Sequence, residues 1–390
     1  MAYRIQIFGI RRLIGLALLG TLLAAFSLRP ARAEAPPAVL DAEAVPHLAA
    51  EGRVGYRRFL QQATPRAFAL APDGSWGWAA AQPDMAATEA RALQICAQWG
   101  GKECRIYARD LAVVWNGDVR APGTPPGEVF AAGPGWTLLP DARFLWRGPG
   151  RAHGAYVWAH GRAAGGQDSR GSQPQPHVRV FNNAGWDVFR FDRDPMTDET
   201  DTAAGWLRAA LRELRKRGYT RLVAAGQSRG GWNALQALSE PGLADAVVAV
   251  APAAHGARGS PAWAWALQDL RRVVATARSP AARVAVVTFA GDEFDPDPAG
   301  RAAILRGLAA RTEALLFLDR PAGLSGHGGG AEAGFTQRYG ECLLEFVEGG
   351  PGCEEAADRL VAGSAPLAGA MAVGGMLPTP AAMKASPRTR

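Results

Sequence analysis

The segment VAAGQSRGGWNAL, residues 223–235, contains the pattern G-x-S-x-G around Ser228. A short apolar run precedes the pattern and a helix-like stretch follows it directly, so a strand must turn sharply into a helix at the serine. Gly226 and Gly230 suit such a turn, because a Cβ at either position would meet the adjoining strand or helix. The turn would lift the Ser228 hydroxyl above the edge of a sheet, where it can act as a nucleophile.

A serine hydroxyl is a poor nucleophile without a base, and the chain has six histidines. His327 follows the last predicted strand, in a glycine-rich loop that can fold back over the sheet. His255 is the rival; it comes earlier in the chain and is expected near the pocket. The base in turn needs a carboxylate to orient it. Asp292 and Asp295 both follow a predicted strand and leave this choice open, with Glu293 as a weaker alternative.

The chain order serine, acid, histidine is that of the α/β-hydrolases, which residues 140–350 resemble. The chain is most similar to dienelactone-hydrolase-like proteins and exported esterases. The resemblance implies a mostly parallel sheet covered by helices, and an acyl-enzyme formed on Ser228. It also implies an oxyanion hole made by the backbone N–H groups of Arg229 and of either Gly161 or Arg162, in a His-Gly turn. We expect no cofactor and no metal ion.

Four further residues are candidate substrate contacts: His160, Gln227, Trp263 and Trp265. His160 is expected to be a structural residue of its turn rather than a catalyst. The two tryptophans lie in the segment where α/β-hydrolases often carry a lid. They would either line an acyl pocket or form the packing face of a covering helix. The predicted partner is a small ester or amide substrate.

Short apolar runs alternate with helical patterns over residues 136–360, which predicts a mainly parallel sheet with helices on both faces. The predicted strands are 142–148, 155–161, 186–192, 221–226, 245–252, 283–291 and 314–319. Residues 202–218 are predicted to form an amphipathic helix, since apolar side chains recur on one face and a glycine ends the pattern. The alternation therefore predicts an α/β-hydrolase fold for this domain.

Residues 65–115 predict a small α+β domain, with two strands around an Asp-Gly turn, then a helix and a further strand. Cys96 lies at the end of this helix, and Cys104 is the first residue of the next predicted strand. An even number of cysteines in an exported chain favours disulfides. Of the three pairings that four cysteines allow, Cys96–Cys104 with Cys342–Cys353 is the most economical.

Residues 1–33 are interpreted as a secretory signal, with an arginine pair, an apolar core and an A-x-A site that predicts cleavage after Ala33. An uncleaved anchor and a twin-arginine export signal are the alternatives. These residues hold five arginines and no acid, so without them the net charge falls from +7 to +2. Such a small charge gives no reason to expect nucleic acid as a partner. No other stretch is predicted to span a membrane.

The remaining boundaries follow from composition. Residues 34–64 are predicted to form a Pro/Ala-rich leader and the start of the N-terminal region, residues 116–135 a Gly/Pro-rich linker, and residues 361–390 a disordered tail. The predicted function is an exported serine hydrolase, periplasmic or secreted, that acts on esters and, by the same chemistry, on amides. The alternative is an envelope binding protein that keeps the fold without turnover.

Overall fold

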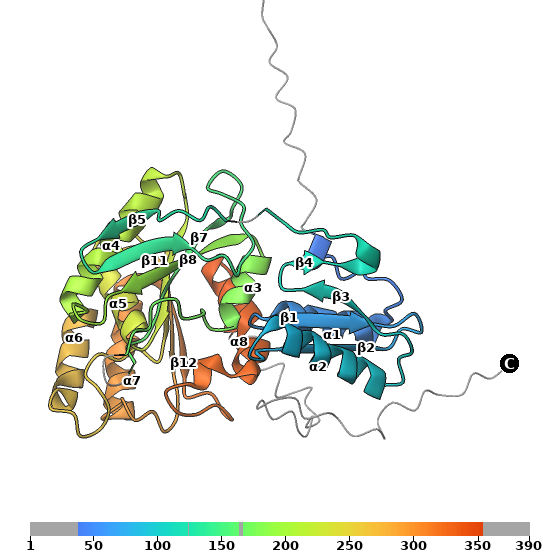
Figure 1. Ribbon diagram of the computed structural model, residues 1–390. Helices are drawn as coiled ribbons and strands as arrows, with labels where there is room; N and C mark the ends of the chain where they lie inside the picture. The colour runs from blue at the N-terminus through green and yellow to red at the C-terminus, as the bar shows by residue number, and fades with distance from the viewer. Residues whose placement is uncertain (1–37, 124, 164–166, 354–390) are drawn as a thin grey trace, which may run out of the picture. The chain divides into compact units, whose positions relative to one another are not determined.

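The computed structural model describes residues 38–123, 125–163 and 167–353 of the chain. The predicted signal at residues 1–33 and the predicted tail at residues 361–390 lie outside these ranges. The described chain contains two sheets, one of four strands and one of eight (Figure 1).

The smaller sheet is antiparallel, in the order β2-β1-β3-β4. Its elements are η1 (Ala38–Leu40), α1 (Ala50–Leu60), β1 (Arg66–Leu70), β2 (Trp76–Ala80), α2 (Met85–Gln98), β3 (Arg105–Arg109), β4 (Ala112–Val113) and η2 (Trp115–Gly117). Side chains of β1 alternate between two clusters, so that Phe68 packs with α1 and Ala69 packs with α2. Gly74 in the predicted turn has a φ of 86°, a conformation that glycine adopts without steric cost.

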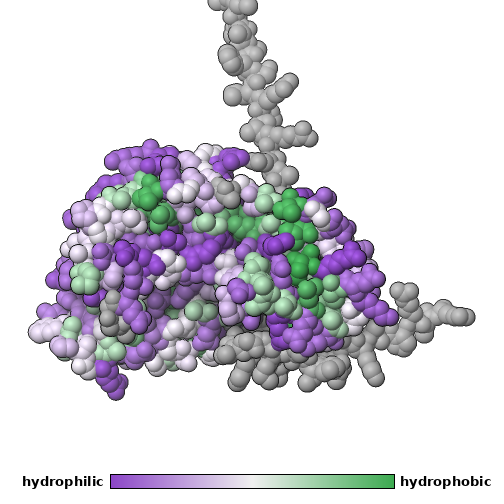
Figure 2. Space-filling view, in the orientation of Figure 1, coloured by the Kyte–Doolittle hydropathy of each residue, from purple (hydrophilic) through white to green (hydrophobic). Residues whose placement is uncertain are grey.

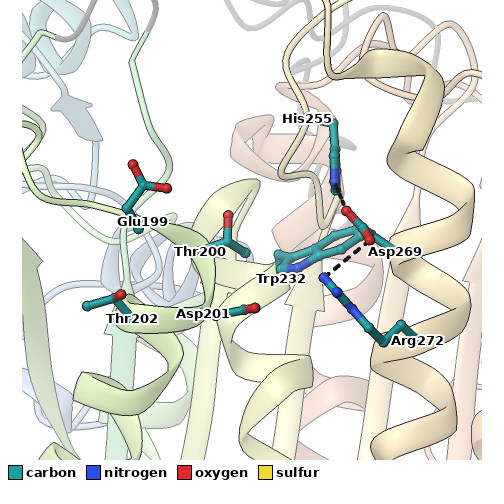
Figure 3. Close-up of a pocket in the computed structure, with 8 residues that line it drawn as sticks. All are labelled: Glu199, Thr200, Asp201, Thr202, Trp232, His255, Asp269 and Arg272. Atoms are coloured by element: carbon teal, nitrogen blue, oxygen red, sulfur yellow. Dashed lines mark hydrogen bonds and ion pairs between the residues drawn. The ribbon is translucent and has the colours of Figure 1, made fainter.

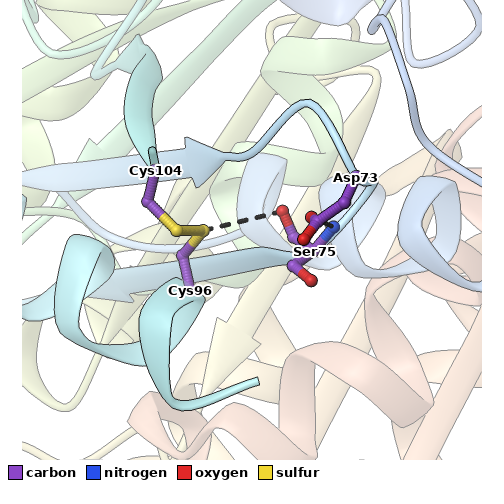
Figure 4. Close-up of a disulfide and its surroundings, with 4 residues drawn as sticks. All are labelled: Asp73, Ser75, Cys96 and Cys104. Atoms are coloured by element: carbon purple, nitrogen blue, oxygen red, sulfur yellow. Dashed lines mark hydrogen bonds between the residues drawn. A yellow bond between two sulfur atoms is a disulfide. The ribbon is translucent and has the colours of Figure 1, made fainter. Parts of the chain in front are cut away.

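Two disulfides connect the four cysteines in the predicted pairing, which is confirmed. Cys96 at the end of α2 is bonded to Cys104, with Cα atoms 6.2 Å apart. Figure 4 shows that the sulfur of Cys96 also contacts the backbone oxygen of Ser75, 3.6 Å away, at the turn before β2. Cys342 is bonded to Cys353, with Cα atoms 4.8 Å apart. Each bridge therefore joins a helix to the segment that follows it.

The larger sheet has the order β12-β11-β10-β9-β7-β8-β6-β5. Its strands are β5 (Ala131–Gly133), β6 (Trp136–Pro140), β7 (Gly154–Ala159), β8 (Trp186–Arg193), β9 (Leu222–Gln227), β10 (Ala246–Val250), β11 (Ser279–Thr288) and β12 (Thr312–Asp319). The pairs from β8 across to β12 are parallel, whereas β6 pairs antiparallel with β8 and β5 pairs antiparallel with β6. The carboxyl ends of the parallel strands consequently share one edge.

Helices cover both faces of this sheet (Figure 1). They are α3 (His177–Asn183), α4 (Thr200–Lys216), α5 (Arg229–Ala237), η4 (Trp263–Trp265), α6 (Ala266–Thr276), α7 (Pro298–Arg306), η5 (Gly307–Ala310), η6 (Gly329–Ala331) and α8 (Ala333–Val347). Val247 packs on one face with side chains of α4, α5 and α6. Its neighbour Val248 packs on the other face with side chains of α3 and α8. Burial on both faces explains the continuous apolar runs, and the predicted α/β-hydrolase fold is confirmed.

The start of this domain differs from the prediction. Residues 142–148, predicted as a strand, form turns and loop, and the strand is β6 just before them. Asp141 accepts a hydrogen bond from the backbone N–H of Arg143, an arrangement that competes with strand pairing. The Asn182 side chain hydrogen-bonds to both backbone groups of Leu145: its Oδ1 accepts from the N–H and its Nδ2 donates to the carbonyl oxygen. Side-chain hydrogen bonds, one from within the loop and two from Asn182 in α3, thus replace strand pairing there. Strand β5 lies within the segment interpreted as a linker.

Within the described ranges, no helix has the length and apolar character needed to cross a bilayer. The face shown in Figure 2 is largely polar, with hydrophobic residues gathered in small groups. The exposed large apolar side chains of the described residues are Val54, Val119, Val129, Met196 and Trp265. Single exposed side chains of this kind are ordinary on a protein surface.

Candidate active site

Ser228 stands at the sharp turn between β9 and α5, with φ 56° and ψ −122°, a backbone conformation that costs energy for any residue with a Cβ. Neighbouring glycines permit the turn. An ideal Cβ on Gly226 would lie 2.5 Å from the carbonyl carbon of Gly230, and one on Gly230 would lie 2.5 Å from that of Ala159. Since both neighbours are backbone atoms, only glycine lets β9, α5 and β7 approach this closely.

Helix α5 begins at Arg229, directly after the serine. The first N–H groups of a helix have no intrahelical acceptor, and the helix dipole adds positive potential at this end. The backbone oxygen of Ser228 accepts from the N–H groups of Trp232 at 2.9 Å and Ala253 at 3.1 Å, which anchors the turn. The N–H of Arg229 therefore suits the predicted role as a donor to developing negative charge.

His327 is paired with Asp292. Its Nδ1 lies 3.0 Å from both carboxylate oxygens, and both side chains are largely buried. Asp292 also accepts the backbone N–H of Phe294 at 2.9 Å, and the Phe294 ring lies on the imidazole with centroids 4.1 Å apart. An Nδ1–H donated to the carboxylate leaves Nε2 as an acceptor, and this atom is buried with no hydrogen-bond partner.

The Gln227 side chain links the histidine loop to the serine. Its Nε2 donates to the backbone oxygen of His327 at 3.2 Å, and Gln227 immediately precedes Ser228. An ideal Cβ on Gly161 would lie 2.7 Å from Oε1 of Gln227 and 3.3 Å from Cβ of Ser228. The His-Gly turn, the serine and the histidine loop therefore converge, and the Gln227 amide is engaged within the protein.

Asp295, the other predicted acid, makes different contacts. One oxygen lies 3.9 Å from Nε of Arg301, and the other accepts the backbone N–H of Asp297 at 3.2 Å. Burial raises the pKa of Asp295, while Arg301 acts in the opposite direction. The structure thus places Asp292 beside His327 and Asp295 beside Arg301.

His160, a predicted substrate contact, is 4% exposed. Its Nδ1 lies 2.6 Å from the backbone oxygen of Gly161, and its Nε2 accepts the backbone N–H of Arg193 at 3.0 Å. Burial, together with the charge of Arg193, lowers the pKa of His160 to about 4, so the ring is neutral. Both ring nitrogens therefore have partners within the protein, and the two predicted roles of His160, as a substrate contact and as a structural residue of its turn, stay predictions.

The rival histidine, His255, belongs to a second pair. Its Nε2 lies 2.6 Å from a carboxylate oxygen of Asp269 in α6. Figure 3 shows this pair on the wall of a hollow of about 230 Å³. The hollow is lined by Glu199, Thr200, Asp201, Thr202, Trp232, His255, Asp269 and Arg272. Neither Ser228 nor His327 lines it, so this pair is separate from the one formed by His327.

The remaining predicted residues lie at the surface or in the segment before α6. Arg162 is exposed. The guanidinium carbon of Arg258 lies over the Trp263 ring, 5.8 Å from the ring centroid. Trp265 is 59% exposed. Both tryptophans belong to η4 rather than to the packed face of α6, and the acyl-pocket interpretation stays a prediction. Among the described residues, no group of three or more His, Cys, Asp and Glu side chains could hold a metal ion.

Three residues beside this site are not among those predicted from the sequence: Arg193, Asp198 and Phe294. Arg193 is the last residue of β8 and Asp198 lies in the loop that follows; both are almost fully buried, and the Phe294 ring lies on His327. The available signal is their position, because residues at the carboxyl end of a buried parallel strand, or in the loop beyond it, lie at the edge where such sites form.

The mainly parallel eight-stranded sheet, with helices on both faces, is the arrangement of an α/β-hydrolase fold. No family model and no curated protein sequence matches the chain. Among solved structures it is similar to an esterase from Pyrococcus furiosus, at 17% identity over 54% of this chain and 87% of that one, with a TM-score of 0.38. A dienelactone hydrolase from Anabaena variabilis has 19% identity, 58% and 98% coverage, and a TM-score of 0.39. Est1E from Butyrivibrio proteoclasticus has 14% identity, with 58% of this chain and 100% of that chain covered, and a TM-score of 0.40.

Proposed function

We propose that this protein is an exported serine hydrolase that cleaves small carboxylic esters through an acyl-enzyme. One observation carries the proposal. The His327–Asp292 pair is tied by Gln227 to the strained turn that holds Ser228, at the edge shared by the carboxyl ends of the parallel strands. A protein that only binds has no need for a nucleophile, a base with a free nitrogen and an orienting acid in one place.

In the proposed reaction, Oγ of Ser228 attacks the ester carbonyl carbon while Nε2 of His327 takes the hydroxyl proton. Asp292 holds the imidazole by Nδ1 and stabilises the imidazolium. The tetrahedral intermediate then collapses, and the C–O bond to the alcohol breaks as His327 returns the proton to the leaving oxygen. Water, deprotonated by His327, attacks the acyl-enzyme in the same way and releases the acid. Amide cleavage would use the same steps.

The oxyanion of each tetrahedral intermediate would accept hydrogen bonds from the N–H of Arg229 and from that of Gly161 or Arg162. Removing one such donor typically costs about 2.7–4 kcal/mol of transition-state stabilisation. Preorganised backbone donors also require no reorganisation during the reaction. This role is consistent with the position of Gly161 against Ser228.

Labelling with a fluorophosphonate probe tests the nucleophile. We expect labelling and hydrolysis of short-chain esters by the wild type, with both lost in Ser228→Ala. Failure of the folded wild type to react with the probe and with a panel of esters of different chain lengths would favour the binding protein instead.

The acid is tested by Asp292→Asn, for which we expect kcat to fall by roughly 10⁴-fold, because the amide no longer stabilises the histidine in the required form. Asp269→Asn is the matched control, since it changes an acid of another His–Asp pair outside the proposed machinery. Equal losses in the two variants would contradict the assignment of Asp292.

Export is the second part of the proposal, and the two disulfides support it because such bonds persist in oxidising compartments. The N-terminus of protein recovered from a periplasmic or secreted fraction tests it. We expect the mature chain to begin at Glu34, whereas recovery of the protein from the cytosol with its first 33 residues intact would contradict export.

A further inference from the structure

Three charged side chains are buried together next to the proposed oxyanion hole: Arg193, Asp198 and Arg229. Their side chains are 0%, 2% and 9% exposed. Nε of Arg193 lies 3.2 Å from one carboxylate oxygen of Asp198, and Nη1 of Arg229 lies 3.9 Å from the other. Nη1 of Arg229 also donates to the backbone oxygen of Asp198 at 3.2 Å. A single carboxylate therefore faces two guanidinium groups.

Arg193 anchors the His-Gly turn. Its Nη2 donates to the backbone oxygen of His160 at 2.6 Å, and its backbone N–H donates to Nε2 of the same histidine. His160 in turn donates through Nδ1 to the backbone oxygen of Gly161. Both carbonyls of the turn are thus held toward the protein interior. Because C=O and N–H point in opposite directions across a planar trans peptide, the N–H groups of Gly161 and Arg162 are turned away from these partners.

Arg229 anchors the other part of the proposed oxyanion hole, at the start of α5. Its backbone N–H is the first of α5, and its side chain reaches back to Asp198 and to the backbone oxygen of Ala254, to which Nη2 donates at 3.1 Å. The side chain therefore restrains the residue whose backbone would donate to the oxyanion. Asp198 contacts both anchors at once.

The charges explain why this acid matters. Burial lowers the pKa of both Arg193 and Arg229, while Asp198 acts in the opposite direction on each. Without the carboxylate, two buried guanidinium groups would face each other unpaired, and a buried charge left without its partner is strongly unfavourable. The two arginines would then separate or draw in water, and the groups that they hold would move with them.

We infer that Asp198 is a positioning residue of the oxyanion hole: its carboxylate holds Arg193 and Arg229 together and so sets the spacing between the two groups of backbone donors. The inference rests on the proposed function, since it concerns the hole that serves Ser228. A shift of about 1 Å between such donors is enough to cost up to 10²-fold in rate.

The test is Asp198→Asn, which keeps the size of the side chain and removes its charge. We expect kcat for a short-chain ester to fall roughly 10- to 100-fold with KM within about twofold, because the hole acts mainly on the transition state. The affinity for a trifluoromethyl ketone, whose tetrahedral adduct carries an oxyanion, should fall in proportion to kcat/KM. A merely structural role would lower Tm and leave both values for the folded protein unchanged, which would overturn the inference.

The matched control is Asp141→Asn, another buried acid, 2.6 Å from its arginine partner Arg143. It should lower stability without changing kcat. Should Asp198→Asn not fold, Arg229→Met serves instead, because it keeps the backbone N–H and removes the anchor; the same loss in kcat is expected, and an unchanged kcat refutes the inference. Fluorophosphonate titration of the wild type separates the two proposals, since a wild type that does not react contradicts the hydrolase itself.

Discussion

The glycine at position 230 allows a quantitative test of the turn that presents Ser228. An ideal Cβ on Gly230 would lie 2.5 Å from the carbonyl carbon of Ala159 and 2.8 Å from the backbone oxygen of His160. Ordinary contact needs about 3.5 Å, and the backbone oxygen of Ala159 lies closer to this Cβ than the carbonyl carbon does, so α5 and β7 must separate by more than about 1 Å in Gly230→Ala. These atoms are backbone and cannot rotate aside as a flexible side chain would.

We therefore expect Gly230→Ala to cost about 3 kcal/mol in overpacking, near the upper end of such effects. The better helix propensity of alanine returns about 1 kcal/mol. The net loss of about 2 kcal/mol should lower Tm by roughly 4–8 °C for a domain of this size. Differential scanning calorimetry or urea unfolding measures it.

Gly205→Ala is the matched control, since it makes the same substitution within α4. Only the far end of the Arg208 side chain comes near an ideal Cβ there, at 3.9 Å. Its Tm should rise by roughly 2–4 °C, because only the propensity term of about 1 kcal/mol remains. If Gly230→Ala were as stable as Gly205→Ala, the close approach of α5 to β7, and the reasoning built on it, would be refuted.

Three further outcomes are expected. Burial lowers the pKa of His177 to about 3, against about 6.5 in the unfolded chain. The free energy of unfolding should therefore fall by up to about 1.4 kcal/mol for each pH unit below pH 6.5, because the unfolded chain binds the proton more tightly. His177→Phe should make the dependence of Tm on pH shallower, and an unchanged slope would argue against this reasoning. Cys342→Ser opens a bridge of sequence separation 11 to Cys353 and should cost about 3 kcal/mol, seen in urea unfolding as a lower midpoint than that of the oxidised wild type. Phe294→Leu removes the ring that lies on His327 and should lower kcat roughly tenfold with KM little changed, whereas wild-type kinetics would show that the ring does not orient the imidazole.

Local features of the chain account for much of what could be predicted. The helix at residues 202–218 was predictable because its apolar face repeats with the helical period, and α4 buries Leu207, Leu211 and Leu214 as expected. The disulfide pairing was predictable because each pair is close in sequence. The turn at Ser228 was predictable because its glycines, strand and helix are contiguous.

Contacts between distant segments settle the rest. Asp292 and Asp295 are the same residue type and lie three residues apart in one loop. Which of them lies against His327 depends on where α7 places Arg301, because Arg301 pairs with Asp295. His160 resembles a site residue in sequence, yet the backbone N–H of Arg193, at the end of β8, donates a hydrogen bond to its Nε2.

Pattern and spacing carry information about neighbours along the chain, so the amino-acid order was sufficient for the fold class, the cysteine pairs and the serine turn. The partner of a buried charge is chosen when remote elements exclude water around it, because only then does an unpaired group become costly. The contact of Asp292 with His327, and that of Asp198 with Arg193 and Arg229, became visible only once the chain was folded.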